Sequence, residues 1–459
     1  MIRVGKCGMK LGITLFLLLI SFSAISQAHR VQFGKNRIQY KYFDWEYYHS
    51  DNFEVYFYQG GQDLAKRSIE FLEAEFSRIT ETIGYPPYAK TRVFIYNSIS
   101  DKQQSNVGVK GKDFTVGGQT NFVKSQVEVS YSGDYSSFRK KLIFSVTDML
   151  VQEMLFGGNI AEMFQSTFSS PIPRWFTSGV SAYVAYGWDK ESDDLVREYT
   201  YNNQTDRFVK LSPEANVLIG QSIWNFVAQR YGQRSISNIL NLARIIRNEE
   251  NSIARTLGIP FDRFMSEWRG FYNNIQVSLM ESYKIPGDEY LIGKNSRAAK
   301  YTSVKFSPDG NLLAYASMDE GKFEVYVKNL TSNKEIMLKK GGNKLLDQEV
   351  DRSLPLISWA DETTLGIVTN EQGSNVLTIK RIGTRGQQVI GIPRLSRIQS
   401  FDFKYKGRIA VLTGDLNGRS DAFVFNINRG QIRRITNDNF DVKDVSIVPE
   451  TNVVLFISH

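Results

Sequence analysis

Hydrophobic and polar positions in the first part of the chain switch between strand-like and helix-like spacing. The segments FEVYFY at 53–58 and RVFIY at 92–96 are short and rich in aromatic and β-branched residues, which predicts two strands. Between them, apolar residues from Ala65 to Ile83 recur at steps of three and four on one helical face, and Gly84 ends the helix. The pattern predicts a strand–helix–strand unit.

The next part of the chain is predicted to be mostly helical. Residues 97–112 are polar and predict a loop, whereas Val127 to Tyr131 predict a strand. A helix at about 137–156 has so many apolar positions that it must be largely buried. Further helices are predicted at 174–187, 222–231, 236–247 and 261–273. Together these elements predict an α+β domain.

The pattern changes after residues 284–297, where Pro, Gly and charged residues interrupt the helical spacing and predict a linker. Four later segments, at 304–317, 357–370, 401–414 and 445–458, each show an alternating strand, a turn and a second strand. Their starts lie 53, 44 and 44 residues apart, and such periods are typical of propeller blades. We therefore predict an all-β propeller over 298–459 with about three and a half blades, incomplete in this chain. A sandwich of unrelated hairpins is the alternative.

Composition and charge exclude several function classes. With 42% apolar residues among 459, the chain is not mainly disordered. Its surplus of eight basic residues is not clustered, so we expect no nucleic-acid partner. The one cysteine, Cys7, excludes a disulfide scaffold or a Cys-rich zinc site. No histidine lies between His49 and His459, which leaves a serine hydrolase without its usual base.

The N-terminus predicts export. Arg3, Lys6 and Lys10 precede an apolar stretch from Leu11 to about Phe22, and small residues follow at 26 and 28. We interpret residues 1–28 as a cleaved signal peptide. The alternative is a retained anchor, but the apolar core has about a dozen residues where a membrane span needs ~20. We thus expect a periplasmic or outer-membrane associated protein with no transmembrane segment after cleavage.

The segment PRWFTSGVSAYVAY at 173–186, together with FDWEYYHSDNFEVYFYQGG at 43–61 and the C-terminal repeats, carries a family resemblance. The chain resembles gluzincin-type metallopeptidase domains of the peptidase MA kind joined to TolB-like β-propellers, as in Bacteroidetes envelope proteins. The resemblance implies an α+β metallopeptidase-like domain at 29–283. In the active family, a buried helix carries His-Glu-x-x-His, and a later helix carries Trp-Phe-x-Glu-Gly-x-Ala-x-Tyr, whose Glu is the third zinc ligand.

This chain departs from the family pattern at each zinc ligand. Trp175, Phe176, Gly179 and Tyr183 match the second stretch, but Ser178 stands at the position of the glutamate. Three registers are open for the first ligand pair, namely Phe144/Asp148, Asp148/Gln152 and Gln152/Phe156, and only the last keeps a glutamate, Glu153. Because no register supplies three side chains able to hold zinc, we expect no cofactor and no metal-dependent hydrolysis.

The leading hypothesis is therefore a non-catalytic, exported pseudo-peptidase whose propeller acts as a protein-binding scaffold in the cell envelope. The binding candidates are the residues of a vestigial cleft: Asp148, Gln152, Glu153, Trp175, Phe176, Ser178 and Tyr183. Ordinary core packing of the three aromatic residues is the competing interpretation. Two alternatives stay open: a zinc-dependent metallopeptidase with atypical ligands, and a cell-wall glycan-binding protein that uses the propeller aromatics Tyr315, Tyr326, Trp359 and Tyr405. A peptide is a further candidate ligand.

Overall fold

The computed structural model describes residues 39–105, 107, 126–156, 172–201, 208, 210–280, 292, 300–344, 349–404, 408–438 and 440–458. The predicted signal peptide lies outside these residues, as does the predicted linker apart from residue 292. The chain divides into two compact units. All helices and strands named below belong to the unit formed by residues 40–104 and 120–459.

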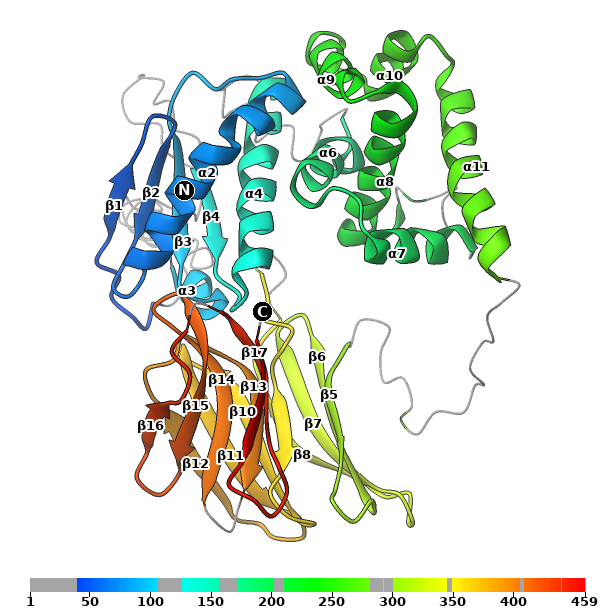
Figure 1. Ribbon diagram of the computed structural model, residues 1–459. Coiled ribbons are helices and arrows are strands. Elements are labelled where there is room, and N and C mark those ends of the chain that lie inside the picture. Colours follow the sequence, from blue (N-terminus) through cyan, green and yellow to red (C-terminus); the bar gives the residue numbers. More distant parts are fainter. Residues whose placement is uncertain are drawn as a thin grey trace, which may run out of the picture. The chain divides into compact units, whose positions relative to one another are not determined.

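The unit begins with a four-stranded sheet in the order β1-β2-β3-β4 (Figure 1). Strand β1 (Glu46–His49) is antiparallel to β2 (Phe53–Phe57), whereas β3 (Thr91–Tyr96) and β4 (Gln126–Ser130) run parallel to β2. Helix α2 (Gln62–Ile83) connects β2 to β3 and ends at Gly84, whose φ of 74° is a left-handed conformation that favours glycine. The predicted strand–helix–strand unit is confirmed.

One prediction for this region is wrong. The segment predicted as a loop contains helix α3 (Ile99–Gln104), which follows β3. Its polar sequence shows no apolar stripe, but Asp101 is buried and accepts hydrogen bonds from Lys41 Nζ at 2.6 Å and from Tyr58 Oη at 2.7 Å. Contacts with residues that are distant in the sequence therefore stabilise this short helix. Such contacts cannot be seen in the local spacing of apolar residues.

Among the described residues, seven further helices follow the sheet: α4 (Tyr135–Phe156), α6 (Arg174–Tyr186), α7 (Lys190–Tyr201), α8 (Pro213–Tyr231), α9 (Arg234–Ile246), α10 (Glu249–Leu257) and α11 (Phe261–Met280). As predicted, α4 is largely buried. Helix α8 begins nine residues before the predicted start, because Pro213 occupies its first turn and the Ser212 hydroxyl accepts from the backbone of Ala215. Helices α7 and α10 were not predicted. The sheet and these helices share one hydrophobic core.

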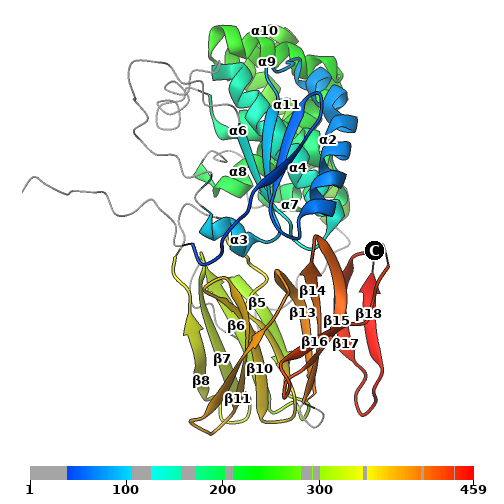
Figure 2. The same cartoon turned by 90° about the vertical axis from the view of Figure 1, so that its left-hand side faces the viewer.

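From residue 300 on, the described part of the chain forms three four-stranded antiparallel sheets and one two-stranded sheet (Figure 2). The first contains β5 (Lys300–Phe306), β6 (Leu312–Asp319), β7 (Lys322–Asn329) and β8 (Glu335–Gly341). The second contains β9 (Leu356–Trp359), β10 (Thr364–Glu371), β11 (Ser374–Arg381) and β12 (Gln387–Ile392). The third contains β13 (Arg397–Lys404), β14 (Ile409–Leu416), β15 (Arg419–Asn426) and β16 (Gln431–Arg434), and the last β17 (Val442–Ile447) and β18 (Val454–Ser458).

These sheets form a β-propeller-like region. Their first strands β5, β9, β13 and β17 contact one another in this order, as expected when blades follow each other around an axis. Each of the four predicted hairpins corresponds to the first two strands of a sheet, so the predicted repeat is confirmed. None of the described helices combines the length and the apolar character needed to cross a membrane.

Candidate functional site

Helices α4 and α6 pack against each other and bring two of the predicted site residues together. Burial raises the pKa of the Asp148 carboxyl above its usual value, although the facing hydroxyl of Ser178, the charge of Arg174 and the hydroxyl of Ser181 each act in the opposite direction. Asp148 Oδ1 is buried and has no hydrogen-bond partner among the described residues. The structure thus places Asp148 opposite Ser178, the position that the resemblance assigns to the third ligand.

Glu153 lies elsewhere on the same helix and has a different partner. Its carboxylate accepts a hydrogen bond of 3.1 Å from the hydroxyl of Tyr85, which follows α2, and the pKa of Tyr85 is raised by burial and by this carboxylate. Gln152 is partly buried next to it. Glu153 therefore supports the packing around the end of α2.

Two of the predicted cleft aromatics are core residues. The exposed fraction is 3% for Trp175 and 0% for Phe176. The ring of Phe176 packs against Trp224 at 5.0 Å, and its carbonyl oxygen accepts a hydrogen bond of 2.9 Å from the Trp224 indole. Tyr183 is partly buried, which raises its pKa. For Trp175 and Phe176 the burial favours the core-packing interpretation.

An open cavity of about 680 Å³ lies beside this helix crossing. The rings of Phe144 on α4 and Tyr186 at the end of α6 stack at 5.9 Å in its wall. The exposed Leu195 of α7 adds a second apolar contact surface. Its other lining residues are polar or charged: Ser132, Ser137, Lys140, Lys141, Ser145, Asp189, Glu191, Ser192, Gln221 and Glu349. Of all the residues that line the cavity, the sequence motifs singled out only Phe144.

Two of the charged residues that line this cavity, Glu349 and Lys141, form an ion pair with each other. Glu349 forms ion pairs with Lys141 of α4 and, at 3.0 Å, with Lys102 of α3. Burial raises the pKa of Glu349, but the two lysines together outweigh burial and hold that pKa below its usual range. Asp189 accepts a hydrogen bond of 2.9 Å from the backbone of Ser192 at the start of α7, which lowers its pKa. The wall therefore combines a small apolar surface with charged and hydrogen-bonding groups.

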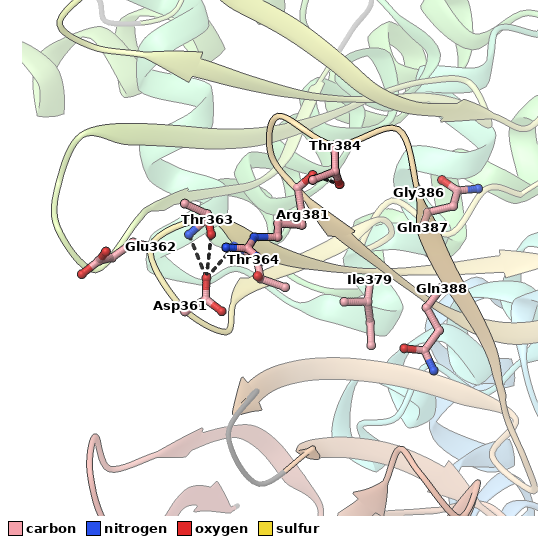
Figure 3. A pocket seen from close by; sticks show the side chains of 10 residues that line it. All are labelled: Asp361, Glu362, Thr363, Thr364, Ile379, Arg381, Thr384, Gly386, Gln387 and Gln388. Atoms are coloured by element: carbon pink, nitrogen blue, oxygen red, sulfur yellow. Dashed lines mark hydrogen bonds between the residues drawn. The ribbon is translucent and has the colours of Figure 1, made fainter.

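A second groove, of about 550 Å³, lies on the second blade (Figure 3). The carboxylate of Asp361 accepts hydrogen bonds from the backbones of Thr363 and Thr364 at 2.9 and 2.8 Å, drawn as dashed lines in Figure 3. This carboxylate thus stabilises the turn between β9 and β10, as Asp does in Asx turns. Within this groove, Asp361 therefore has a structural role.

Within the described ranges, no three His, Cys, Asp or Glu side chains converge as metal ligands would. The cavity wall itself has two exposed acidic residues, Asp189 and Glu191, and the paired Glu349. The described lining presents the stacked rings of Phe144 and Tyr186 and several hydrogen-bonding groups to a ligand.

No family model matches the chain, and no curated protein matches it. Among solved structures, a putative TolB from Agrobacterium tumefaciens is similar at 17% identity and a TM-score of 0.28, over 34% of this chain and 52% of that chain. TolB from Acinetobacter baumannii is similar at 16% identity and a TM-score of 0.26, over 35% of this chain and 43% of that chain. A structure from a study of two prolyl endopeptidases is similar at 16% identity and a TM-score of 0.27, over 37% of this chain and 29% of that chain. The chain thus spans about half or less of the length of each of these three proteins.

Proposed function

We propose that this protein is a non-catalytic pseudo-peptidase, exported to the periplasm or the outer membrane, that binds a protein partner in the cell envelope. The observation that carries the proposal is the pair Asp148 and Ser178 at the crossing of α4 and α6. A catalytic zinc needs three protein ligands that donate lone pairs. In the register Phe144/Asp148, one of the three that the resemblance leaves open, this chain has the phenyl ring of Phe144, the buried carboxyl of Asp148 and the hydroxyl of Ser178 at these positions.

The partner-binding surface is the cavity between α4, the end of α6 and α7. Apolar and aromatic surface with a polar rim is the composition from which protein interfaces gain most of their affinity. Here the stacked rings of Phe144 and Tyr186, with the exposed Leu195, supply the apolar centre. Lys140 and Glu191 stand on the rim and are exposed. A cavity of about 680 Å³ accommodates a few side chains of a partner.

Site-specific photo-crosslinking in native envelopes tests this surface. A photo-reactive phenylalanine at Tyr186, which is 36% exposed in the cavity wall, is expected to capture a discrete partner. The matched control places the same group at Tyr88, which is 89% exposed and does not line this cavity. In the protein that carries the photo-reactive group at position 186, the added substitution Leu195→Glu is expected to reduce the amount of crosslinked partner at least about tenfold. The reason is that it puts a charge into the apolar centre of the cavity.

Two results would remove the cavity as the binding surface. One is the same set of crosslinks from Tyr186 and Tyr88. The other is a Tyr186 crosslink that Leu195→Glu leaves unchanged while the protein stays folded.

Three of the four propeller aromatics named for glycan binding are described, and none of the three favours that alternative. Tyr315 is fully buried and Trp359 is 8% exposed, so neither offers a ring face to a sugar. The Tyr326 ring stacks on Tyr315 at 5.3 Å, and its hydroxyl donates to Glu324 at 2.7 Å. Tyr405 lies outside the described residues. The atypical zinc peptidase stays the second candidate, and a metal determination separates it from the proposal.

A further inference from the structure

A groove of about 530 Å³ lies on the third blade, which consists of β13 to β16. Its walls are β15, β16, the turn between these two strands and the segment that connects β12 to β13. Of the nine described residues that line it, three are arginines and none is acidic. We call it the arginine groove after Arg394, Arg429 and Arg433. The described lining therefore carries a net positive charge.

The three arginines of the groove differ from the other arginines of this blade in having no partner. Arg394, Arg429 and Arg433 are exposed, and none of their guanidinium groups forms an ion pair or a hydrogen bond with another described residue. The arginines of the blade that lie outside the groove each have a side-chain partner: Arg397 with Asp351, Arg408 with Asn428, Arg419 with Asp63 and Arg434 with Asp421. The donors in the groove are thus available to a ligand.

The second blade has a groove at the equivalent place, shown in Figure 3, but with a different charge. In the second blade the cross-strand pair Ile379 and Gln388 lines the groove. In the third blade the equivalent pair is Val424 and Arg433. The charged residues that line the groove of the second blade are one arginine and two acids: Arg381, Asp361 and Glu362. The groove therefore recurs in two successive blades, whereas the purely cationic lining belongs to the third.

We propose that the arginine groove binds a phosphate monoester or pyrophosphate group between Arg394, Arg429 and Arg433. A guanidinium group is planar and presents paired N–H donors that match two oxygens of a phosphate. A phosphate monoester carries a charge of about −1.5 to −2 at pH 7. It therefore gains more from three neighbouring cations than a carboxylate does with its single charge.

The rest of the groove fits a ligand larger than one phosphate. Its volume of about 530 Å³ lies in the range of small-molecule sites, so it also takes part of the group that carries the phosphate. The side-chain amides of Asn426 and Gln431 can donate hydrogen bonds to that group, and the half-buried Val424 and Ile432 add apolar surface. This inference goes beyond the proposed function, because none of these residues lines the cavity beside α4.

Isothermal titration calorimetry of the purified full chain with inorganic pyrophosphate tests the proposal. We expect saturable binding with a Kd below about 1 mM at low salt. The affinity should fall as the salt concentration rises, because the three guanidinium groups are exposed to screening. Arg429→Gln and Arg433→Gln are each expected to weaken binding at least about fivefold, since each removes a charge-assisted contact. Both side chains are exposed, so the variants keep their fold, which circular dichroism checks.

The matched control is Arg381→Gln in the groove of the second blade. This residue is also exposed, but Asp361 and Glu362 line the same groove and repel an anion. The control should therefore change the affinity for pyrophosphate by less than about twofold.

Vesicle binding distinguishes the two sources of such a group. Cosedimentation with vesicles of phosphatidic acid, but not of phosphatidylcholine, would assign the phosphate to a lipid headgroup. Pyrophosphate binding without vesicle binding would assign it to a soluble phosphorylated compound, and either result supports the site. Three outcomes overturn the proposal: no saturable binding up to about 10 mM pyrophosphate, parental affinity in both Arg429→Gln and Arg433→Gln, or a loss in Arg381→Gln as large as in those two variants.

Discussion

The carboxyl of Asp415 on β14 is the buried group whose replacement should change stability most clearly with pH. Asp415 is fully buried, and the amide nitrogen of Gln399 lies 2.8 Å from its Oδ1. Its Oδ2 has no hydrogen-bond partner among the described residues. Burial raises its pKa to about 7, since the charges of Asp441 and Asp351 add to burial and outweigh the attraction of Arg397.

The sign of the effect follows from the raised pKa. The unfolded chain ionises Asp415 near pH 3.8, whereas the folded chain keeps the proton until about pH 7. Folding stability therefore falls as the pH rises from about 4 to 7 and does not fall further above 7. The full difference between the two pKa values corresponds to about 4 kcal/mol at pH 8. Water entry and movement of neighbouring loops relieve part of this cost, so we expect about 2 kcal/mol.

The variant Asp415→Asn removes the ionisation and keeps the shape of the side chain. In urea unfolding at pH 5 and pH 8, the variant should be about 2 kcal/mol more stable than the parent at pH 8. That advantage should shrink by at least about 1 kcal/mol at pH 5, where folded Asp415 is neutral. The matched control is Asp421→Asn, which removes the ion pair with Arg434 in the next strand and should destabilise the protein. An Asp415→Asn variant that is less stable than the parent at pH 8 would refute the reasoning.

Three further predictions concern the helices and the site. At the crossing of α6 and α8, a Cβ added at Gly220 would lie 2.0 Å from a backbone carbonyl oxygen, so Gly220→Ala should cost about 3 kcal/mol or more in thermal unfolding. Gly270→Ala on α11 meets nothing within 4 Å and should stabilise by about 0.5 to 1 kcal/mol. If the register Phe144/Asp148 is right, replacing both residues by histidine and Ser178 by glutamate should create zinc binding at least ~10-fold tighter than in the parent by calorimetric titration. Equal zinc affinity in the two proteins would show that the register is wrong.

The sequence was most informative where the pattern is local. The alternating pairs of strands with turns between them predicted the four C-terminal hairpins, because blade strands repeat with a fixed length and period. The stripe from Ala65 to Ile83 predicted α2 for the same reason: the burial of one helical face is visible in its spacing. Where a polar segment is held by distant partners, as in α3, the spacing predicted a loop.

The candidate site was predictable only in part. The motif comparison drew attention to Asp148 and Ser178, and these two residues face each other. The same motif singled out Trp175 as a cleft residue, but the match reflects the packing of the indole in the core. Glu349 contributes to the cavity from a position 208 residues after its ion-pair partner Lys141 of α4. The spacing of residues along the chain cannot predict an ion pair between such distant positions. A lone glutamate in a polar segment likewise has no feature in a single sequence that marks it as part of a site.

The central claim is that the α4–α6 crossing holds no catalytic metal. Elemental analysis of the purified full chain, together with a peptide hydrolysis assay before and after chelation, tests it most directly. The account predicts less than about one tenth of a zinc ion per chain and no turnover that a chelator abolishes. One zinc ion per chain, with hydrolysis lost on chelation and regained on adding zinc, would contradict it.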